Sequence, residues 1–427
     1  MAVLKKSIIS LLLILIGCST IDSKLAGGAW LLLIIFGLII WLLKSKEKSS
    51  VPALQLITLR KVVKIWLFFT TLALILKLLG VVYWGEDLSE RHAEFRLFLG
   101  ALGIYGISHI KNIDEYQMHI RLGMIISTSV ACLSALVFFI IYGFEAAPTN
   151  KIPWSGGIAL MVIATVGLAG HTQRSWERFL IFISAICGLL AILLIETRGA
   201  YLALLIVPFL IISIIIKFNS NKTSIASFSK YGSQQLRIIF GLILVSAFFI
   251  ILSTSSYLKP DFDRVEVANK EMHDALNKKD GSFDTGVGAR IYMWRESVNI
   301  LKDKWLFGIG KDKRVKMVKN YGVSINSEVI QSLGHVHNEY LHVMLDHGIL
   351  GLSSFLSYTI GLLVIALQFW RKKIRIPSLT FIGLALMHNF AELTNVNFSH
   401  NYYPIMLSLS ISILLLSVMI SNDNKLQ

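Results

Sequence analysis

The sequence has 427 residues, of which 55% are hydrophobic and only 16% are charged, and its formal net charge is +15. Soluble domains carry about 25% charged residues, so a chain this apolar cannot cover a water-exposed surface with polar side chains. The composition therefore excludes an ordinary soluble enzyme, a disordered protein and a secreted disulfide scaffold. It predicts an all-α polytopic membrane protein. The three cysteines, Cys18, Cys132 and Cys187, lie in apolar runs and have neither a disulfide pattern nor a metal-binding spacing.

Apolar stretches long enough to approach or cross a bilayer recur along the chain and predict about 12 transmembrane helices. They lie at residues 7–21, 29–43, 64–83, 96–110, 122–142, 153–170, 179–196, 200–216, 238–256, 349–369, 377–394 and 403–421. The text from Lys5 to Cys18 also resembles a lipoprotein signal. Removing it would disturb the regular alternation of the loops, so we expect residues 7–21 to be the first span.

The positions of lysine and arginine predict the orientation, because cytoplasmic loops hold an excess of both. With a cytoplasmic N-terminus, the cytoplasmic segments contain 21 of these residues. The short outer loops then contain only five: Lys24, Arg91, Arg96, Lys151 and Arg198. We therefore expect both termini in the cytoplasm, and the net charge is chiefly a topology signal.

One connection, residues 257–348, is far too long for a simple turn and lies on the outer face in this topology. It contains 14 basic and 13 acidic residues, so it is nearly neutral. Helical periodicity predicts a helix over 287–301 and another over 338–347, so this loop is partly helical. The expected organisation is helices 1–9 in residues 1–256, the large loop in 257–348, and helices 10–12 with the C-terminus in 349–427.

Four of the eleven histidines lie within thirteen residues near the end of this loop: His335, His337, His342 and His347. Three interpretations remain open. They could be hydrogen-bonded structural groups, or metal ligands together with Glu339 and Asp346, although the spacing matches no strong metal motif. One imidazole could instead be a general base near neutral pH. His337 lies at the expected helix start, where loop geometry can direct its side chain into a cavity.

Two arginines on the outer side are candidate anion sites, because a guanidinium binds phosphate through two parallel hydrogen bonds. Arg198 lies in the tight connection after the seventh span, where it could also simply extend towards the membrane surface. Arg290 follows Gly286 and Gly288 at the start of a predicted helix, a weak phosphate-binding pattern. The sequence Asp261-Phe262-Asp263 matches a metal-binding pattern of enzymes that use nucleotide sugars. Nucleotide sugars are made in the cytoplasm and this segment is expected outside, so we do not assign it a role.

The outer half of the eleventh span and the segment after it hold four polar residues: His388, Glu392, Asn395 and His400. Ionisable groups at membrane depth usually face a cavity or the bundle interior. They either line the same site as His337 or form a structural hydrogen-bond network.

The topology and three short motifs resemble the O-antigen ligase superfamily, whose members are similar to GT-C-type glycosyltransferases. The motifs are His337-Asn338-Glu339-Tyr340-Leu341 with the following Asp346 to Gly351, Thr197-Arg198-Gly199, and Gly288-Ala289-Arg290 with Trp294. The resemblance covers the topology throughout, whereas the motifs cover some forty residues. The family includes O-antigen ligases, O-antigen polymerases and protein O-oligosaccharyltransferases.

The resemblance implies a periplasmic enzyme of the bacterial inner membrane that takes a glycan from undecaprenyl diphosphate and transfers it to a sugar of lipid A–core. It implies His337 as the catalytic base, Arg198 and Arg290 as ligands of the diphosphate, and no metal or other cofactor. Glu339, His335 and His400 are the expected supporting residues. No nucleic-acid partner is expected, and the surrounding membrane lipids would hold the lipid tail of the donor.

Two rival functions follow from the same sequence. A polymerase would use a second lipid-linked repeat as the acceptor, and a protein O-oligosaccharyltransferase would use serine or threonine of secreted proteins. A transporter is a different class that also suits about twelve spans. Against a transporter stand the absence of an evident internal repeat and the concentration of polar residues in one outer loop.

Overall fold

The computed structural model describes residues 2–42, 53–87, 92–109, 117–143, 147–172, 174–220, 259–277 and 282–420. Within these ranges all regular secondary structure is helical, as the composition predicts. The chain divides into two compact units. The first comprises Met1–Ile214, Ser297–Lys316 and His335–Gln427, and the second comprises Ile215–Glu296 and Met317–Gly334.

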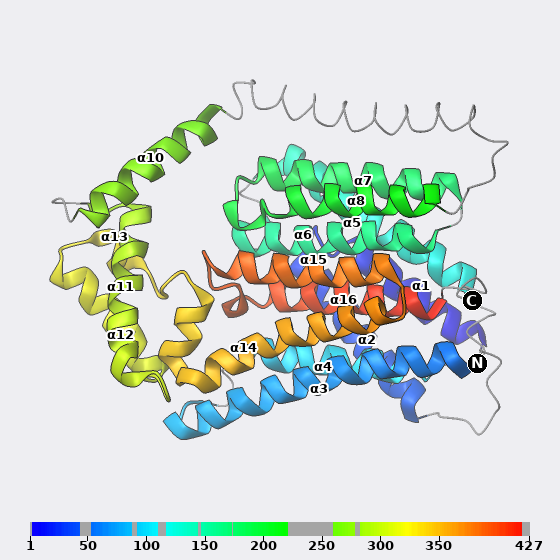
Figure 1. Ribbon diagram of the computed structural model, residues 1–427, viewed down its shortest axis with the longest axis horizontal. Helices are drawn as coiled ribbons and strands as arrows, with labels where there is room; N and C mark the ends of the chain where they lie inside the picture. Colours follow the sequence, from blue (N-terminus) through cyan, green and yellow to red (C-terminus); the bar gives the residue numbers. More distant parts are fainter. Residues whose placement is uncertain are drawn as a thin grey trace. The chain divides into compact units, whose positions relative to one another are not determined.

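The first unit consists mainly of long apolar helices, several of which run side by side (Figure 1). In chain order they are α1 (Ala2–Gly17), α2 (Ser23–Leu42), α3 (Ala53–Trp84), α4 (His92–Ile107), α5 (Gln117–Tyr142), α6 (Lys151–Leu168), α7 (Ser175–Leu194), most of α8 (Ala203–Ser220), α14 (Glu339–Arg371), α15 (Arg375–Glu392) and α16 (Tyr402–Ile420). Three short 3-10 helices, η3 (Ala169–His171), η4 (Arg198–Ala200) and η6 (Asn397–Ser399), lie between them.

Six of these helices are long and apolar enough to cross a membrane: α2, Arg60–Trp84 of α3, Met118–Tyr142 of α5, α6, α7 and α14. Shorter apolar helices lie in α1, α8 and α16. Every predicted span except one coincides with a helix, and the exception, 238–256, lies outside the described residues. The helices confirm a multi-pass membrane protein, whereas the number of about 12 spans and the orientation stay predictions.

Helix α2 begins six residues before the predicted span at 29–43. The reason is local, because Asp22 provides a cap: its carboxylate accepts the Lys24 N–H at 2.7 Å and its carbonyl accepts the Ala26 N–H at 3.1 Å. Capping at the N-terminus satisfies donors that have no partner inside the helix. The apolar pattern alone therefore placed the start too late.

Helices α2 and α4 approach each other through glycines. A Cβ atom added to Gly37 would lie 2.0 Å from the carbonyl oxygen of Gly103, and one added to Gly106 would lie 2.1 Å from the Gly37 carbonyl oxygen. Small residues allow such backbone contact between membrane helices, where packing replaces the hydrophobic effect as the driving force. This contact explains why glycines occur inside two apolar helices.

Helix α6 lies at the core of the first unit. Its residues from Pro153 to Leu168 are all buried. It packs against α5, α7, α15 and α16, and the Trp154 indole N–H donates to the Thr20 carbonyl at 2.9 Å. A helix that is apolar around its whole circumference is typical of such a central position.

Helix α14 is broken at Gly348, whose φ of 59° and ψ of −139° interrupt the helical path. In a continuous helix the Leu345 carbonyl would accept the Ile349 N–H. Here the Ile349 N–H donates to the Leu306 carbonyl at 3.2 Å, and the Leu345 carbonyl accepts the Ile309 N–H at 2.7 Å. The segment 306–310 thus replaces the hydrogen bonds that the kink removes.

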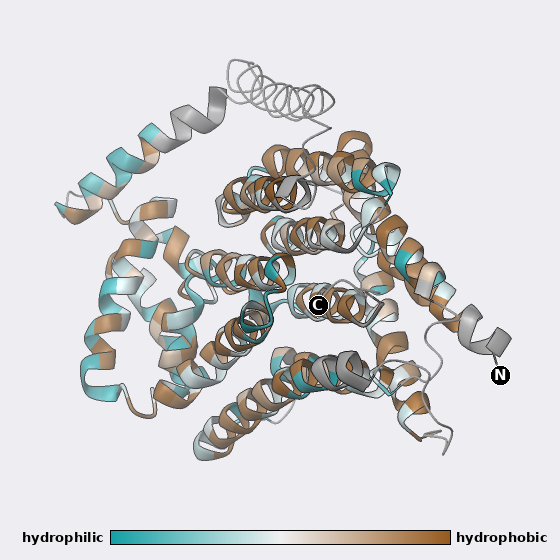
Figure 2. Ribbon diagram, turned by 45° about the vertical axis from the view of Figure 1, so that its right-hand side comes forward, coloured by the Kyte–Doolittle hydropathy of each residue, from teal (hydrophilic) through white to brown (hydrophobic). Residues whose placement is uncertain are grey.

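The second unit includes α10 (Lys259–Leu276), the first part of α11 (Gly286–Lys304), the later part of α12 (Lys311–Ser324), and α13 (Glu328–Ser332). The described part of α10 mixes teal and brown in Figure 2, whereas brown dominates the long helices of the first unit. Asp284 accepts the Ser327 hydroxyl at 2.7 Å and the Val329 N–H at 3.2 Å. These hydrogen bonds lower the pKa of the exposed Asp284 carboxyl and join α13 to the start of α11.

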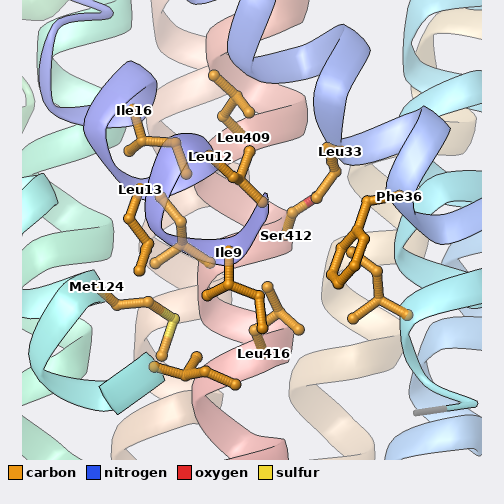
Figure 3. Close-up of a pocket in the computed structure, with 13 residues that line it drawn as sticks. Ile9, Leu12, Leu13, Ile16, Leu33, Phe36, Met124, Leu409, Ser412 and Leu416 are labelled. Atoms are coloured by element: carbon orange, nitrogen blue, oxygen red, sulfur yellow. The ribbon is translucent and has the colours of Figure 1, made fainter. Parts of the chain in front are cut away.

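A small cavity of about 40 Å³ lies among α1, α2, α4, α5 and α16 (Figure 3). Its wall is aliphatic and aromatic except for Ser412. A space of this size without charged groups is a packing gap, and it contains nothing that could perform the expected chemistry.

The glycine contact between α2 and α4 makes Gly37→Ala destabilising. The added methyl group would overlap the Gly103 carbonyl and force the helices apart, at a cost of about 1–3 kcal/mol. We expect a lower thermal unfolding temperature for the detergent-solubilised protein, followed by fluorescence-detected size-exclusion chromatography. The matched control is Gly27→Ala in the same helix, where a Cβ meets nothing within 4 Å. Equal stability of the two variants would contradict the contact.

Candidate functional site

His337, the predicted base, lies in the loop directly before α14. Its backbone is left-handed, with φ of 52°, and its side chain is half-buried. The next residue, Asn338, caps α14 by accepting the Leu341 N–H at 3.0 Å, and its amide donates to the Leu393 carbonyl at 3.0 Å. His337 is therefore fixed between the start of α14 and the end of α15.

Three of the four clustered histidines lie in a row. The His337 N–H donates to Nδ1 of His335 at 3.3 Å, and the two ring centroids are 4.2 Å apart. The ring of His342, one turn into α14, lies 6.5 Å from that of His335. The predicted helix over 338–347 is confirmed, and His342 Nε2 lies one turn from Asp346, 3.5 Å from its carboxylate.

A buried ion pair anchors this row. Arg314, at the start of α12, is only 3% exposed and donates to both carboxylate oxygens of Asp346. His342 Nε2 lies 3.5 Å from the same carboxylate. A buried carboxylate needs such a partner, because an unpaired charge away from water is costly. Arg314 and Asp346 thereby hold the ring of His342 in place.

His347 lies apart from the row, in a second polar cluster between α3 and α14. Lys77 Nζ donates to His347 Nδ1 at 3.4 Å, and His347 Nε2 donates to the Glu86 carboxylate at 2.9 Å. The second Glu86 oxygen accepts the Lys311 N–H at 2.8 Å. Burial raises the pKa of Glu86, but the hydrogen bonds from His347 and Lys311 outweigh it, so the pKa is lowered.

Glu339, a predicted supporting residue, lies close to a second carboxyl group. It is buried in the first turn of α14, next to Glu392 at the end of α15. Glu339 Oε2 accepts the Phe398 N–H at 3.4 Å, and Glu392 Oε2 accepts the Asn397 N–H at 3.0 Å. The polar residues of the eleventh predicted span thus join α15 and the η6 turn to the start of α14.

The predicted Arg198 motif lies at the same end of α15. Helix η4 packs on α15, and a Cβ added to Gly199 would lie 3.3 Å from Thr394 Oγ1 and 3.6 Å from the Ala391 carbonyl. The neighbouring Thr197 hydroxyl donates to Ser155 of α6. The Asn338 amide binds the Leu393 carbonyl at the same place, so the backbone at 197–199 and the residue after His337 both border residues 391–394.

Arg290 belongs to the second unit, in the first turns of α11, and is half-buried. The predicted helix over 287–301 is confirmed by α11, whose start is capped by Thr285 Oγ1 accepting the Gly288 N–H at 3.0 Å. Gly288 is required because a Cβ there would overlap the Ser282 carbonyl. The neighbouring Arg295 pairs with Glu296 at 3.0 Å, as expected for a helix-surface pair.

His400, the third predicted supporting residue, follows the η6 turn, where its N–H donates to the Asn397 carbonyl at 3.0 Å. Burial lowers the pKa of its half-buried ring. Among the residues that the structure describes, no group of three His, Cys, Asp or Glu side chains is arranged to hold a metal ion.

Sequence reasoning missed Arg314, Lys77 and Glu86 as members of this region. The sequence contained a signal for Lys77 and for Arg314. Lys77 lies inside an apolar span, where an ammonium needs a polar partner. Asp346 is a buried acid that needs a cation, and Arg314 is that cation.

Residues 182–356 match the model of a protein family described as O-antigen ligase. The matched segment contains all three motifs, with Arg198, Arg290, His337 and Glu339, and it also contains His335. The match agrees with the resemblance stated from the sequence, over this segment of the chain. A search of curated proteins finds no match.

The Arg314–Asp346 pair makes Arg314→Gln strongly destabilising. The substitution leaves the Asp346 carboxylate buried without its cation, at a cost of about 3–5 kcal/mol. We expect a large drop in the unfolding temperature in detergent. Arg295→Gln is the matched control. It removes the ion pair of Arg295 with the partly exposed Glu296, and such a pair contributes less than about 1 kcal/mol to stability. Similar unfolding temperatures for both variants would contradict the anchoring role.

The lowered pKa of Glu86 predicts a pH-dependent contribution to stability. The ionised carboxylate stabilises the fold above its ordinary pKa of 4.5, and this contribution is lost as the pH falls through the lowered value. We expect Glu86→Gln to lower the unfolding temperature at pH 7, with a difference from the parent protein that narrows below pH 4.5. The exposed Glu328→Gln serves as the control. A difference that stays constant across this range would contradict the prediction.

Proposed function

We propose that this protein is an inner-membrane glycosyltransferase that attaches O-antigen polysaccharide to lipid A–core at the periplasmic face. The donor would be the polysaccharide on undecaprenyl diphosphate. The observation on which the proposal rests is the family match over residues 182–356, which contains the motifs of His337, Arg198 and Arg290. The half-buried imidazole of His337, held between α14 and α15, supports it.

In this mechanism neutral His337 takes the proton of the acceptor hydroxyl as its oxygen attacks the anomeric carbon of the donor sugar. The new glycosidic bond forms while the bond from the sugar to the diphosphate breaks. Attack from the face opposite the leaving group inverts the anomeric centre. The diphosphate leaves with the bonding electron pair, and Arg198 and Arg290 would stabilise its charge.

The positively charged arginines would take the place that a divalent cation has in other glycosyltransferases, since a guanidinium stays protonated and binds phosphate through two hydrogen bonds. The donor is already activated by its diphosphate, so the reaction requires neither ATP nor a cytoplasmic nucleotide. The role of His335, Glu339 and His400 would be to position His337 and the polar surface around it.

His337→Ala is expected to abolish ligation while the protein still accumulates in the membrane, because removing a general base costs about 100-fold or more in rate. The measurement is gel analysis of lipopolysaccharide in a host that lacks its own ligase. His273→Ala, whose side chain is 74% exposed in α10, is the control that should stay active. Arg198→Ala and Arg290→Ala should also weaken transfer. Normal attachment by the His337 variant would refute its role as the base.

The same host distinguishes the rival functions. A ligase restores long polymer on lipid A–core, whereas a polymerase leaves the attachment defect and instead restores chain length in a polymerase-deficient host. Modification of secreted proteins in place of lipid A–core would indicate a protein O-oligosaccharyltransferase.

A further inference from the structure

A basic groove lies along α3, at the opposite end of this helix from Lys77 and Glu86. It has a volume of about 550 Å³ and is lined by three cations, Arg60, Lys61 and Lys64, and by the apolar side chains Ile65, Phe68, Phe69 and Val364. The groove is distant along α3 from the residues placed in the proposed reaction. It belongs entirely to the first unit.

The positive charge in this groove is not neutralised by the described protein. Arg60 donates through Nε to the Ser108 carbonyl at 3.4 Å, and no carboxylate in the described part of the chain pairs with it. Lys61 and Lys64 are exposed, and neither forms an ion pair with a carboxylate among the residues that the structure describes. Three cations within two helical turns therefore attract an anion.

The apolar part of the groove indicates what kind of anion fits. Phe68 is 61% exposed and lies one turn from Lys64, on the same face of a helix that is apolar enough to cross a membrane. The opposite wall is Val364 of α14, which packs on α3 so closely that a Cβ added to Gly361 would lie 2.9 Å from Phe69 Cβ. A ligand would thus meet cations at one end and an exposed hydrocarbon surface at the other.

We propose that this groove binds the phosphate headgroup of an anionic membrane phospholipid. Lys61, Lys64 and Arg60 contact the phosphate, and one acyl chain lies against Phe68. Basic pockets between membrane helices at the water boundary recognise such headgroups. A soluble phosphate would use the cations only and would leave the exposed Phe68 without a partner.

The test uses the full chain in a neutral detergent, stripped of lipid and then titrated with phosphatidylglycerol or phosphatidylcholine of identical acyl chains, with bound lipid counted by native mass spectrometry. We expect preferential retention of phosphatidylglycerol. The Lys61→Gln/Lys64→Gln double variant should weaken its binding about tenfold or more, since each basic residue near a headgroup contributes about fivefold. Phe68→Ser should weaken phosphatidylglycerol binding as well.

The control is the Lys372→Gln/Lys373→Gln double variant, which removes the same charge from the connection after α14 and should retain the lipid. Unchanged elution on size exclusion shows that each variant is folded. Equal retention of the two lipids, or equal loss in both double variants, would overturn the proposal. Displacement of phosphatidylglycerol by an equal concentration of inorganic phosphate would overturn the assignment to a lipid.

Discussion

The polar end of the first unit depends on the break in α14 at Gly348. The kink separates the Leu345 carbonyl from the Ile349 N–H, so each loses the partner that it would have in a continuous helix. Ile309 and Leu306 supply the missing partners, and Gly308 allows the approach because a Cβ there would lie 2.5 Å from the Leu345 carbonyl. One short segment is thereby fixed against the start of a spanning helix.

This placement determines the charges around the histidines. With 306–310 held in position, the following turn of α12 brings Arg314 onto Asp346, and the Lys311 N–H onto Glu86. The Phe307 carbonyl also accepts the Trp84 indole N–H at 2.8 Å, which attaches the same segment to the end of α3. Asp346 and Glu86 thus each have a partner from a distant part of the chain.

The sequence predicted what depends on local pattern. Apolar runs located the helices, and the clustered histidines, the polar end of the eleventh span and the helix over 287–301 were found from composition and periodicity. The start of α2 was wrong because the Asp22 cap is a local signal that a hydropathy pattern does not contain. The pair of Lys77 and His347 could not be predicted, because 270 residues separate the partners and only the packing of α3 on α14 brings them together. The same holds for Arg314 and Asp346.

The site combines an imidazole fixed at a helix start with paired charges and a family match over the same residues. The measurement that tests this account most directly is glycan transfer by the purified protein in detergent, with EDTA present, from a lipid-linked polysaccharide to lipid A–core. Detergent removes the sealed compartment that transport requires but leaves transfer possible. We predict formation of the joined product and of free undecaprenyl diphosphate in equal amounts. Absence of the joined product with a folded protein and both substrates present would contradict the account.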